Sequence, residues 1–460
     1  MINSVNFNSI SNVYANTVQP KCTDNVSVTN PSRNVNFGFN RDFTVAPTYV
    51  GGQKQLRTRL NSQEEKIYKN ILNNLDKKSR KELESLLKKG VLLNSDSNNH
   101  TSVLDNLNKI LTTPRAEGLD CKNILKSTIE ILDNPFKSTQ TFGDIPQEYQ
   151  GKAVLQELNS NNEIKSSQEA KELIDVKNSG SCPAASIEFS MAQKSPAEFT
   201  RFVEGLSSPA VAVEKEISLS NLADNTLDAF WLLNSFEIPY EKKGYDSAVL
   251  KFAPDKNALL RAQIQTKYQD GKERSAVDVL MQSTFMNVGS QQTYDSLSDK
   301  RKGKFSTQDT GLVEFEKTFT ESVVEDKNKI TLTNQKIDDS GKLIGYEYDM
   351  STFKRQLVDT LNSGENVIIG YTFADENNNI VGGHEITLVG THQGKDGKTY
   401  FVCNDSDDDY FGAVEYSEDY LLPKIHHATF PKHIVENDVK FEENWKEGLR
   451  AYKEMKRNAA

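Results

Sequence analysis

Two short segments, far apart in the chain, limit the choice of fold more than any other feature. In residues 178–186, Cys182 follows Gly-Ser and precedes Pro-Ala-Ala, which is typical of a tight turn that opens a helix. Residues 382–405 begin with Gly-Gly-His, turn at a Gly-Lys-Asp-Gly sequence and end in Asn-Asp. Alternating apolar residues on both sides of that turn predict a β-hairpin. A chain with both segments must combine helices with an antiparallel sheet, so we expect an α+β fold.

Cys182 is the candidate nucleophile. A thiolate at a helix N-terminus is stabilised by unsatisfied backbone N–H groups and by the positive end of the helix dipole. Pro183 suits the first helical turn, and the small Ala184 and Ala185 leave the approach open. The alternative is a buried structural cysteine, the commonest role of a free cysteine. The Gly-Ser before Cys182 and the proline after it favour an exposed turn.

His384 is the candidate general base, because a nucleophilic thiol needs a group that accepts its proton. The two glycines before it allow another segment to approach the imidazole ring closely. The alternative is a histidine that only caps the edge of a strand. The remaining histidines are predicted to lie in polar loops (His100 and His392) or in an irregular stretch after a proline (His426 and His427).

The residue that orients His384 is expected to be Asp405 or Asn404. Because the hairpin folds about its turn, its two outer ends lie opposite each other. Successive strand residues point to opposite faces, so only one of Asn404 and Asp405 can face His384. We favour Asp405, which shares its face with Cys403.

The acidic run at 405–409 has two other interpretations. It is compatible with a solvated loop, or with a calcium site in which Asp405, Asp407 and Asp409 alternate. A calcium loop of the EF-hand type requires glycine at its sixth position, where this chain has Tyr410. We therefore disfavour calcium, and the chemistry of cysteine, histidine and aspartate requires neither a metal nor an organic cofactor.

Composition and helical periodicity divide the chain into four parts. Residues 1–60 are rich in Asn, Ser and Thr without helical period, which predicts a disordered leader. Residues 61–140 predict a helical module whose first two helices begin with capping boxes at Ser62 and Ser79. This module is interpreted as a structural or partner-binding bundle, or alternatively as a cover that contacts a downstream cleft.

The rest of the chain has a mixed pattern. Residues 141–435 alternate helical and strand signals and form the predicted main domain, although residues 207–345 contain no motif that we recognise. Residues 436–460 predict a charged amphipathic helix. Within the main domain we expect helices that begin after Ser195 and Ser275, a helix over 222–233, a helix ended by Gly364 and a strand over 367–371.

Bulk properties exclude several classes of protein. The net charge of −10 is spread along the 460 residues without a basic stripe, which argues against nucleic acid as a partner. No apolar run approaches the roughly 18 residues that span a bilayer, and the N-terminus lacks the regions of a Sec signal peptide. We therefore expect a cytoplasmic protein, or one exported by another route. The four cysteines suggest a reducing compartment, with a Cys182–Cys403 disulfide as the alternative.

The order of these elements resembles the papain-like cysteine peptidases, and equally the bacteriocin-processing (C39-like) branch of that fold. The resemblance covers roughly residues 160–435, and it rests on Cys182-Pro183-Ala184-Ala185, on Gly-His at the start of an apolar strand, and on Asn404-Asp405 at the end of the next. It implies a papain-like fold and a cysteine peptidase with a Cys182–His384–Asp405 triad. Its substrate would be a peptide or a protein.

Two departures from the family pattern leave alternatives open. Where these families have a glutamine that holds the oxyanion, this chain has Val176, so Asn178 or the backbone N–H of Cys182 is expected to serve instead. In a second alignment register, Ala185 occupies the nucleophile position, which would make the protein an inactive binding relative. A transglutaminase or deamidase, which uses the same residue order, is a further alternative.

Overall fold

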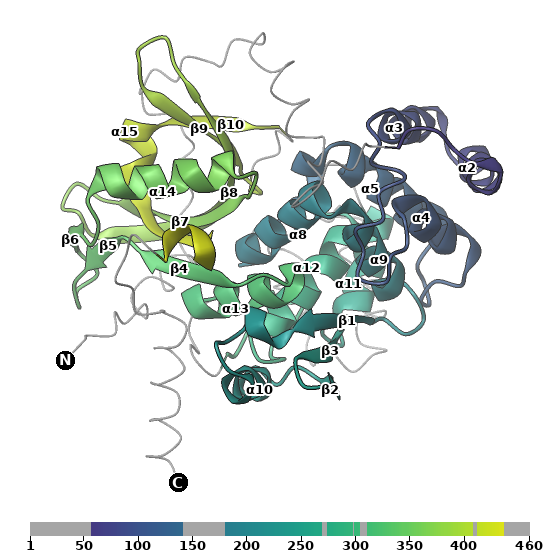
Figure 1. Cartoon of the computed structure of the whole chain (residues 1–460), viewed down its shortest axis with the longest axis horizontal. Helices are drawn as coiled ribbons and strands as arrows, with labels where there is room; N and C mark the ends of the chain where they lie inside the picture. The colour runs from purple at the N-terminus through teal and green to yellow at the C-terminus, as the bar shows by residue number, and fades with distance from the viewer. Residues whose placement is uncertain are drawn as a thin grey trace.

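The computed structural model describes residues 57–140, 180–268, 274–297, 299–303, 311–407 and 412–436 (Figure 1). The predicted leader before residue 57, the predicted C-terminal helix after residue 436 and the candidate oxyanion residue Asn178 lie outside these residues. The described chain has the expected α+β architecture, in which a helical part lies beside a six-stranded antiparallel sheet.

The helical part is built on one continuous hydrophobic cluster that includes side chains from both the predicted helical module and the main domain. Its helices are α2 (Ser62–Asn73), α3 (Lys77–Lys88), α4 (Val103–Thr112), α5 (Cys121–Asp133), α8 (Cys182–Lys194), α9 (Pro196–Leu206), α10 (Thr226–Ser235), α11 (Ala258–Tyr268), α12 (Ala276–Gly289) and α13 (Glu314–Glu325). A small antiparallel sheet accompanies them in the order β1-β3-β2, with β1 at Val213–Ser218, β2 at Tyr240–Lys243 and β3 at Ser247–Phe252.

The predicted helical module packs directly against the helices of the main domain. The side-chain amide of Asn106 in α4 donates to the carbonyl of Ala197 in α9 at 3.1 Å. After α5 the chain makes a short 3-10 turn, η2 (Pro135–Lys137), where the ring of Phe136 lies 5.2 Å from that of Phe189 in α8. Figure 1 shows α4 and α5 beside α8 and α9. The module therefore shares its core with the helix that begins at Cys182.

The first two helices begin earlier than predicted. The cap of α2 is Asn61, whose side chain accepts backbone N–H groups of the first turn and which forms a capping box with Glu64. The cap of α3 is Asp76. The predicted caps Ser62 and Ser79 were wrong because Asn and Asp cap helices as well as Ser does and stand further upstream. Helices α4 and α5 complete the predicted helical module.

Two other helix starts differ in detail from the prediction. Helix α10 begins at Thr226 with Asn225 as its cap, because residues 219–221 form a separate 3-10 turn. Ser195 precedes α9 as expected, but its side chain makes no capping hydrogen bond. Helix α12 begins after Ser275 as expected, with a capping box between Ser275 and Asp278.

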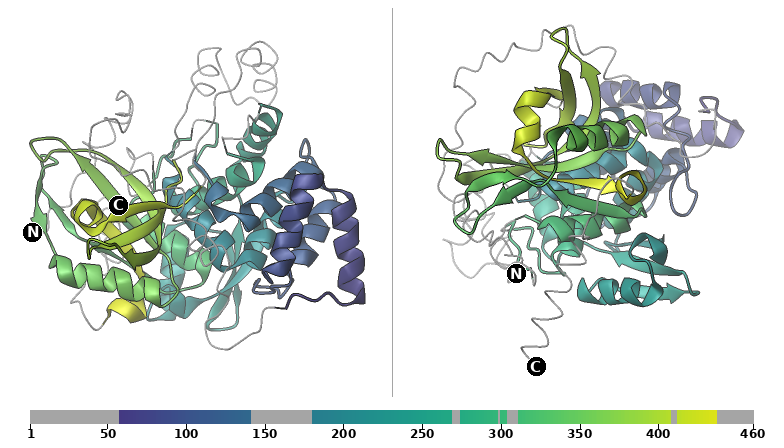
Figure 2. Two further views of the ribbon diagram at one scale, coloured as in Figure 1. Left: turned by 90° about the horizontal axis from the view of Figure 1, so that it is seen from above. Right: turned by 60° about the vertical axis from the view of Figure 1, so that its left-hand side comes forward.

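The six-stranded sheet has the order β10-β9-β8-β7-β11-β4. Helix α14 (Met350–Asn362) packs on one face (Figure 1 and Figure 2), where Phe353 and Leu357 join the apolar cluster of that face. Helices α8 and α13 approach the opposite face, as the contacts of Phe189 with Val389 and of Thr318 with Thr331 indicate. The strands are β4 (Lys329–Thr333), β7 (Val367–Ala374), β8 (Ile380–Gln393), β9 (Thr399–Asn404), β10 (Val414–Ser417) and β11 (Ile425–Pro431).

Shorter elements complete the part of the chain around this sheet. They are β5 (Gln335–Ile337), β6 (Leu343–Tyr346), α15 (Glu418–Leu421), the 3-10 turn η5 (Leu422–Lys424) and α16 (Lys432–Val435). Among the described residues, no helix is both long and apolar enough to cross a membrane.

The predicted hairpin is formed by β8 and β9. Thr387 lies opposite Asn404 and Leu388 lies opposite Cys403. Gly397 in the turn has a φ of 79°, a conformation that glycine adopts without strain. Cys182 and Cys403 are both free, so the alternative disulfide between them is wrong.

Three histidines predicted outside regular strands lie within them. His392 belongs to the end of β8, and His426 and His427 lie in β11. The preceding Pro423 lies within the 3-10 turn η5 (Leu422–Lys424), and β11 begins directly after that turn. The prediction failed for His426 and His427 because β11 is a central strand that is buried on both faces, and such a strand has no alternating apolar pattern. Both of these histidines are buried.

Candidate active site

Cys182 is the first residue of α8, and its turn is held against α12. The hydroxyl of Ser181 donates to the side-chain oxygen of Gln282 in α12 at 3.0 Å. Cys182 itself is half-buried, whereas Ala185, one turn further along the helix, is completely buried. Pro183 occupies the first turn, where its missing N–H costs no hydrogen bond. The local sequence therefore places a partly accessible thiol at a helix N-terminus.

His384 lies in β8 opposite Tyr371 of β7. The two rings meet edge to face, with centroids 5.8 Å apart, so Tyr371 forms one wall of the imidazole site. Only 12% of the His384 side chain is exposed. A histidine so enclosed by the sheet keeps one ring orientation.

Asp405, immediately after β9, contacts His384. Its Oδ1 lies 2.8 Å from Nε2 of His384, and the same oxygen accepts the backbone N–H of Asp407 at 3.2 Å. Asn404, the other candidate, is buried opposite Thr387 in the strand ladder. Of the other residues in the alternative calcium site, Asp407 contacts Asp405 through its backbone N–H, and Asp409 lies outside the described residues. Of the two candidates, the structure brings Asp405 to the histidine.

The electrostatics of this group favour a protonated imidazole. Burial opposes the charged ring, but the charge and hydrogen bond of Asp405, together with a hydrogen bond to the Cys182 thiol, raise the pKa of His384 well above its usual value. For Asp405, burial opposes ionisation, but the charged His384 ring lowers the pKa of the carboxyl group. Since Asp405 occupies Nε2, Nδ1 is the ring nitrogen left for the thiol.

A buried polar network supports the first turns of α8. The amide group of Gln282 donates to Glu188 of α8 at 3.0 Å and to the carbonyl of Thr139 at 2.8 Å. Burial and the neighbouring Asp278 raise the pKa of Glu188 well above its usual value. This network was missed in the sequence because residues 207–345 contain no motif. The sequence predicted a helix after Ser275, but nothing in the pattern shows that Gln282 faces Ser181.

The residues just before position 141 hold the loop that follows Asp405. The backbone N–H of Gln140 and the hydroxyl of Thr139 both donate to the carbonyl of Ser406 at 2.9 Å. The C-terminal end of the predicted helical module is thus hydrogen-bonded beside the orienting carboxylate. These contacts concern the backbone of the loop, and they limit how far Asp405 can move.

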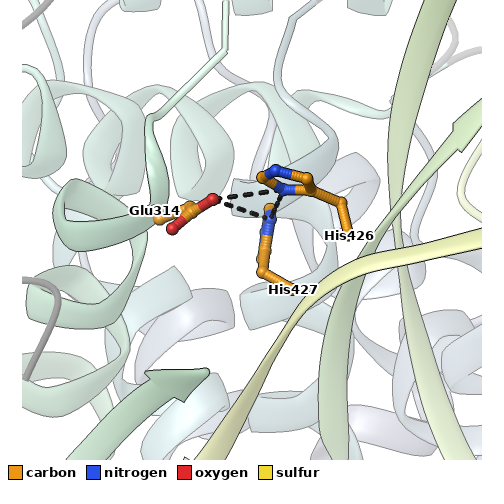
Figure 3. Close-up of side chains that lie close together, drawn as sticks. All are labelled: Glu314, His426 and His427. Carbon is orange, nitrogen blue, oxygen red and sulfur yellow. Dashed lines mark hydrogen bonds and ion pairs between the residues drawn. The ribbon is translucent and has the colours of Figure 1, made fainter. Parts of the chain in front are cut away.

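A second group of ionisable side chains lies elsewhere on the sheet. Glu314, His426 and His427 bring a carboxylate oxygen and two imidazole nitrogens close together (Figure 3). Within the described part of the chain, these three residues are the set with metal-ligand character.

Comparison of the chain with protein-family models, with curated proteins and with solved structures gives no match.

Proposed function

We propose that this protein is a cysteine-dependent hydrolase of the papain-like type, which cleaves peptide bonds with Cys182, His384 and Asp405. The observation that carries the proposal is the imidazole ring of His384, whose Nε2 lies 2.8 Å from the Asp405 carboxylate and whose protonated form the Cys182 thiol stabilises. Thiol catalysis needs a nucleophile, a base and a group that orients the base, and Cys182, His384 and Asp405 would supply these three parts.

In the proposed reaction, the thiol proton of Cys182 passes to His384, and Sγ attacks the substrate carbonyl carbon to form a tetrahedral intermediate. Backbone N–H groups at the start of α8, which have no partner within the helix, would stabilise the oxyanion. The His384 imidazolium then donates its proton to the leaving amine, and a thioester remains on Cys182. Neutral His384 next takes a proton from water, which attacks the thioester and releases the acid. Asp405 holds the ring in one orientation throughout.

The position of Ala185 favours this assignment over the inactive register. Ala185 is completely buried within α8, and its backbone N–H bonds to the carbonyl of Ser181 at 2.8 Å. Cys182 is the residue at the helix start that interacts with His384. A nucleophile must reach a substrate, and of these two positions only Cys182 is partly accessible.

Labelling of the full chain with iodoacetamide near pH 7, read by peptide mass spectrometry, tests the proposal. We expect Cys182 to react faster than Cys22, Cys121 and Cys403. Among the three cysteines that the structure describes, only Cys182 combines a helix N-terminus with an interacting histidine. His384→Ala should slow the labelling of Cys182 without changing that of Cys121, which serves as the internal control. Equal rates for all four thiols would contradict the proposal.

The reaction type is tested with peptide substrates that contain glutamine. Chain cleavage that is abolished in Cys182→Ala supports the peptidase, whereas release of ammonia without cleavage would identify a transglutaminase or deamidase. A reactive Cys182 that turns over neither substrate class would favour the binding relative.

A further inference from the structure

A bulge in β11 places two consecutive histidines on the same side of the strand. In the ladder with β7, Ile425 pairs with Tyr371 and His427 pairs with Gly370, so His426 is one residue in excess. Adjacent residues of a regular strand point to opposite faces, but a bulge re-aims one side chain. Here the Nδ1 atoms of His426 and His427 lie 2.9 Å apart.

Glycine at position 370 makes room for this arrangement. A Cβ atom on Gly370 would overlap the imidazole ring of His427. The ring therefore lies close against the backbone of β7, in space that a side chain at position 370 would fill.

The first residue of α13 supplies a carboxylate to the same point. Oε1 of Glu314 lies 3.1 Å from Nδ1 of His426 and 3.4 Å from Nδ1 of His427 (Figure 3). The other carboxylate oxygen of Glu314 accepts the hydroxyl of Thr333 at 2.8 Å, which holds the group in place.

These three atoms form a triangle with the dimensions of a metal-ligand face. Its edges are 2.9, 3.1 and 3.4 Å. Ligands bound at about 2.0–2.1 Å to tetrahedral zinc lie about 3.3 Å from one another. At most two Nδ1–H protons are available for the three contacts. A cation at the centre would satisfy all three atoms at once.

The surroundings of His427 are those of a metal-bound histidine. Its Nε2 lies 2.7 Å from Oε1 of Glu385, and the other oxygen of Glu385 accepts from the buried ammonium of Lys317 at 3.0 Å. Metal-binding histidines usually donate their second ring N–H to a carboxylate, which orients the ring. With Nε2–H bonded to Glu385, a neutral His427 presents a lone pair at Nδ1 toward Glu314 and His426.

We propose that Glu314, His426 and His427 bind a divalent first-row transition ion, with zinc as the first candidate. Two imidazoles and one carboxylate are ligands that such ions prefer. The ion would join the start of α13 to β11 and, through Glu385, to the strand that carries His384. The site is separate from Cys182 and Asp405, and the proposal does not depend on the proposed function.

The test uses the full chain, stripped with a chelator and then exposed to zinc. Elemental analysis after dialysis should find one zinc per chain. Glu314→Gln, which keeps the shape of the side chain, and His426→Ala should each lose it. Glu385→Gln should weaken binding by about 10- to 100-fold, the usual effect of removing an outer-shell carboxylate. Circular dichroism checks that each variant is folded.

Two controls separate this site from the cysteine site and from surface histidines. The double variant Cys182→Ala/His384→Ala and the variant His392→Ala should both retain one zinc. Cobalt added to the stripped wild-type chain should give visible absorption without the thiolate charge-transfer band of a cysteine ligand. Absence of metal binding by the wild type would overturn the proposal, as would binding that Glu314→Gln and His426→Ala leave unchanged.

Discussion

His384 and Glu385 are consecutive residues of β8, yet they belong to two separate charged groups. His384 pairs with Asp405 at 2.8 Å, whereas Glu385 lies between His427 at 2.7 Å and Lys317 at 3.0 Å. Because neighbouring strand residues point to opposite faces, one strand can serve both groups without placing their charges together. The buried ion pair between Glu385 and Lys317 therefore helps to fix the backbone of β8 at the candidate base, His384.

Replacing Asp405 should impair Cys182 far more than replacing Asn404. Asp405→Ala removes the carboxylate that contacts His384, and we expect turnover or Cys182 labelling to fall by about 10²-fold, near the lower end of what a positioned acid–base group contributes. Asn404→Ala is the matched control, because Asn404 lies opposite Thr387 in the ladder. An equal loss in both variants would assign the orienting role elsewhere.

Stability should depend on pH through His384. Its pKa in the folded chain is raised, so its stabilising contribution is fully present below the unfolded value, about 6.5, and is lost as the pH rises through the folded value. The melting temperature of the wild type should thus exceed that of His384→Gln most clearly near pH 5–6, where Asp405 is also ionised. The difference should shrink toward alkaline pH. A difference that grows with pH would contradict the ion pair.

Gly370→Ala should destabilise the protein, because the added methyl group overlaps the buried ring of His427. We expect a loss of about 1–3 kcal/mol in the free energy of unfolding, typical of overpacking, measured by urea denaturation. Gly345→Ala is the control, since a Cβ atom there meets nothing within 4 Å. Its effect should stay within about 0.5 kcal/mol.

Removing residues 1–140 should prevent folding rather than open a cleft. Side chains of α2 to α5 belong to the same apolar cluster as α8, α9 and α12, so the truncation exposes core surface. Phe136→Ala, a milder change at the contact with Phe189, should cost about 3–5 kcal/mol. A truncated chain that stays folded and turns over small peptides faster would instead support the interpretation of the module as a cover.

Local signals in the sequence were sufficient for much of the fold. Alternation and the glycine turn predicted the pairing of β8 with β9, because side chains repeat every two residues and the turn sets which segments meet. The same alternation required that only one of Asn404 and Asp405 face His384. Helices α8, α9 and α12 began where the turn at Cys182, the Ser195-Pro196 pair and Ser275 predicted them. The starts of α2 and α3 were wrong because several adjacent residues were equally good caps.

Other features depend on contacts between distant segments, which no local pattern encodes. The bulge that turns His426 beside His427 exists because β11 pairs with β7 across Gly370. The approach of Gln282 to Ser181, and of the Cys182 thiol to His384, follows from how α12, α8 and the sheet pack together. Side-chain periodicity specifies which face of an element is buried, but it does not specify its partner. The cysteine and histidine could therefore be chosen from the sequence, while their meeting is a result of packing.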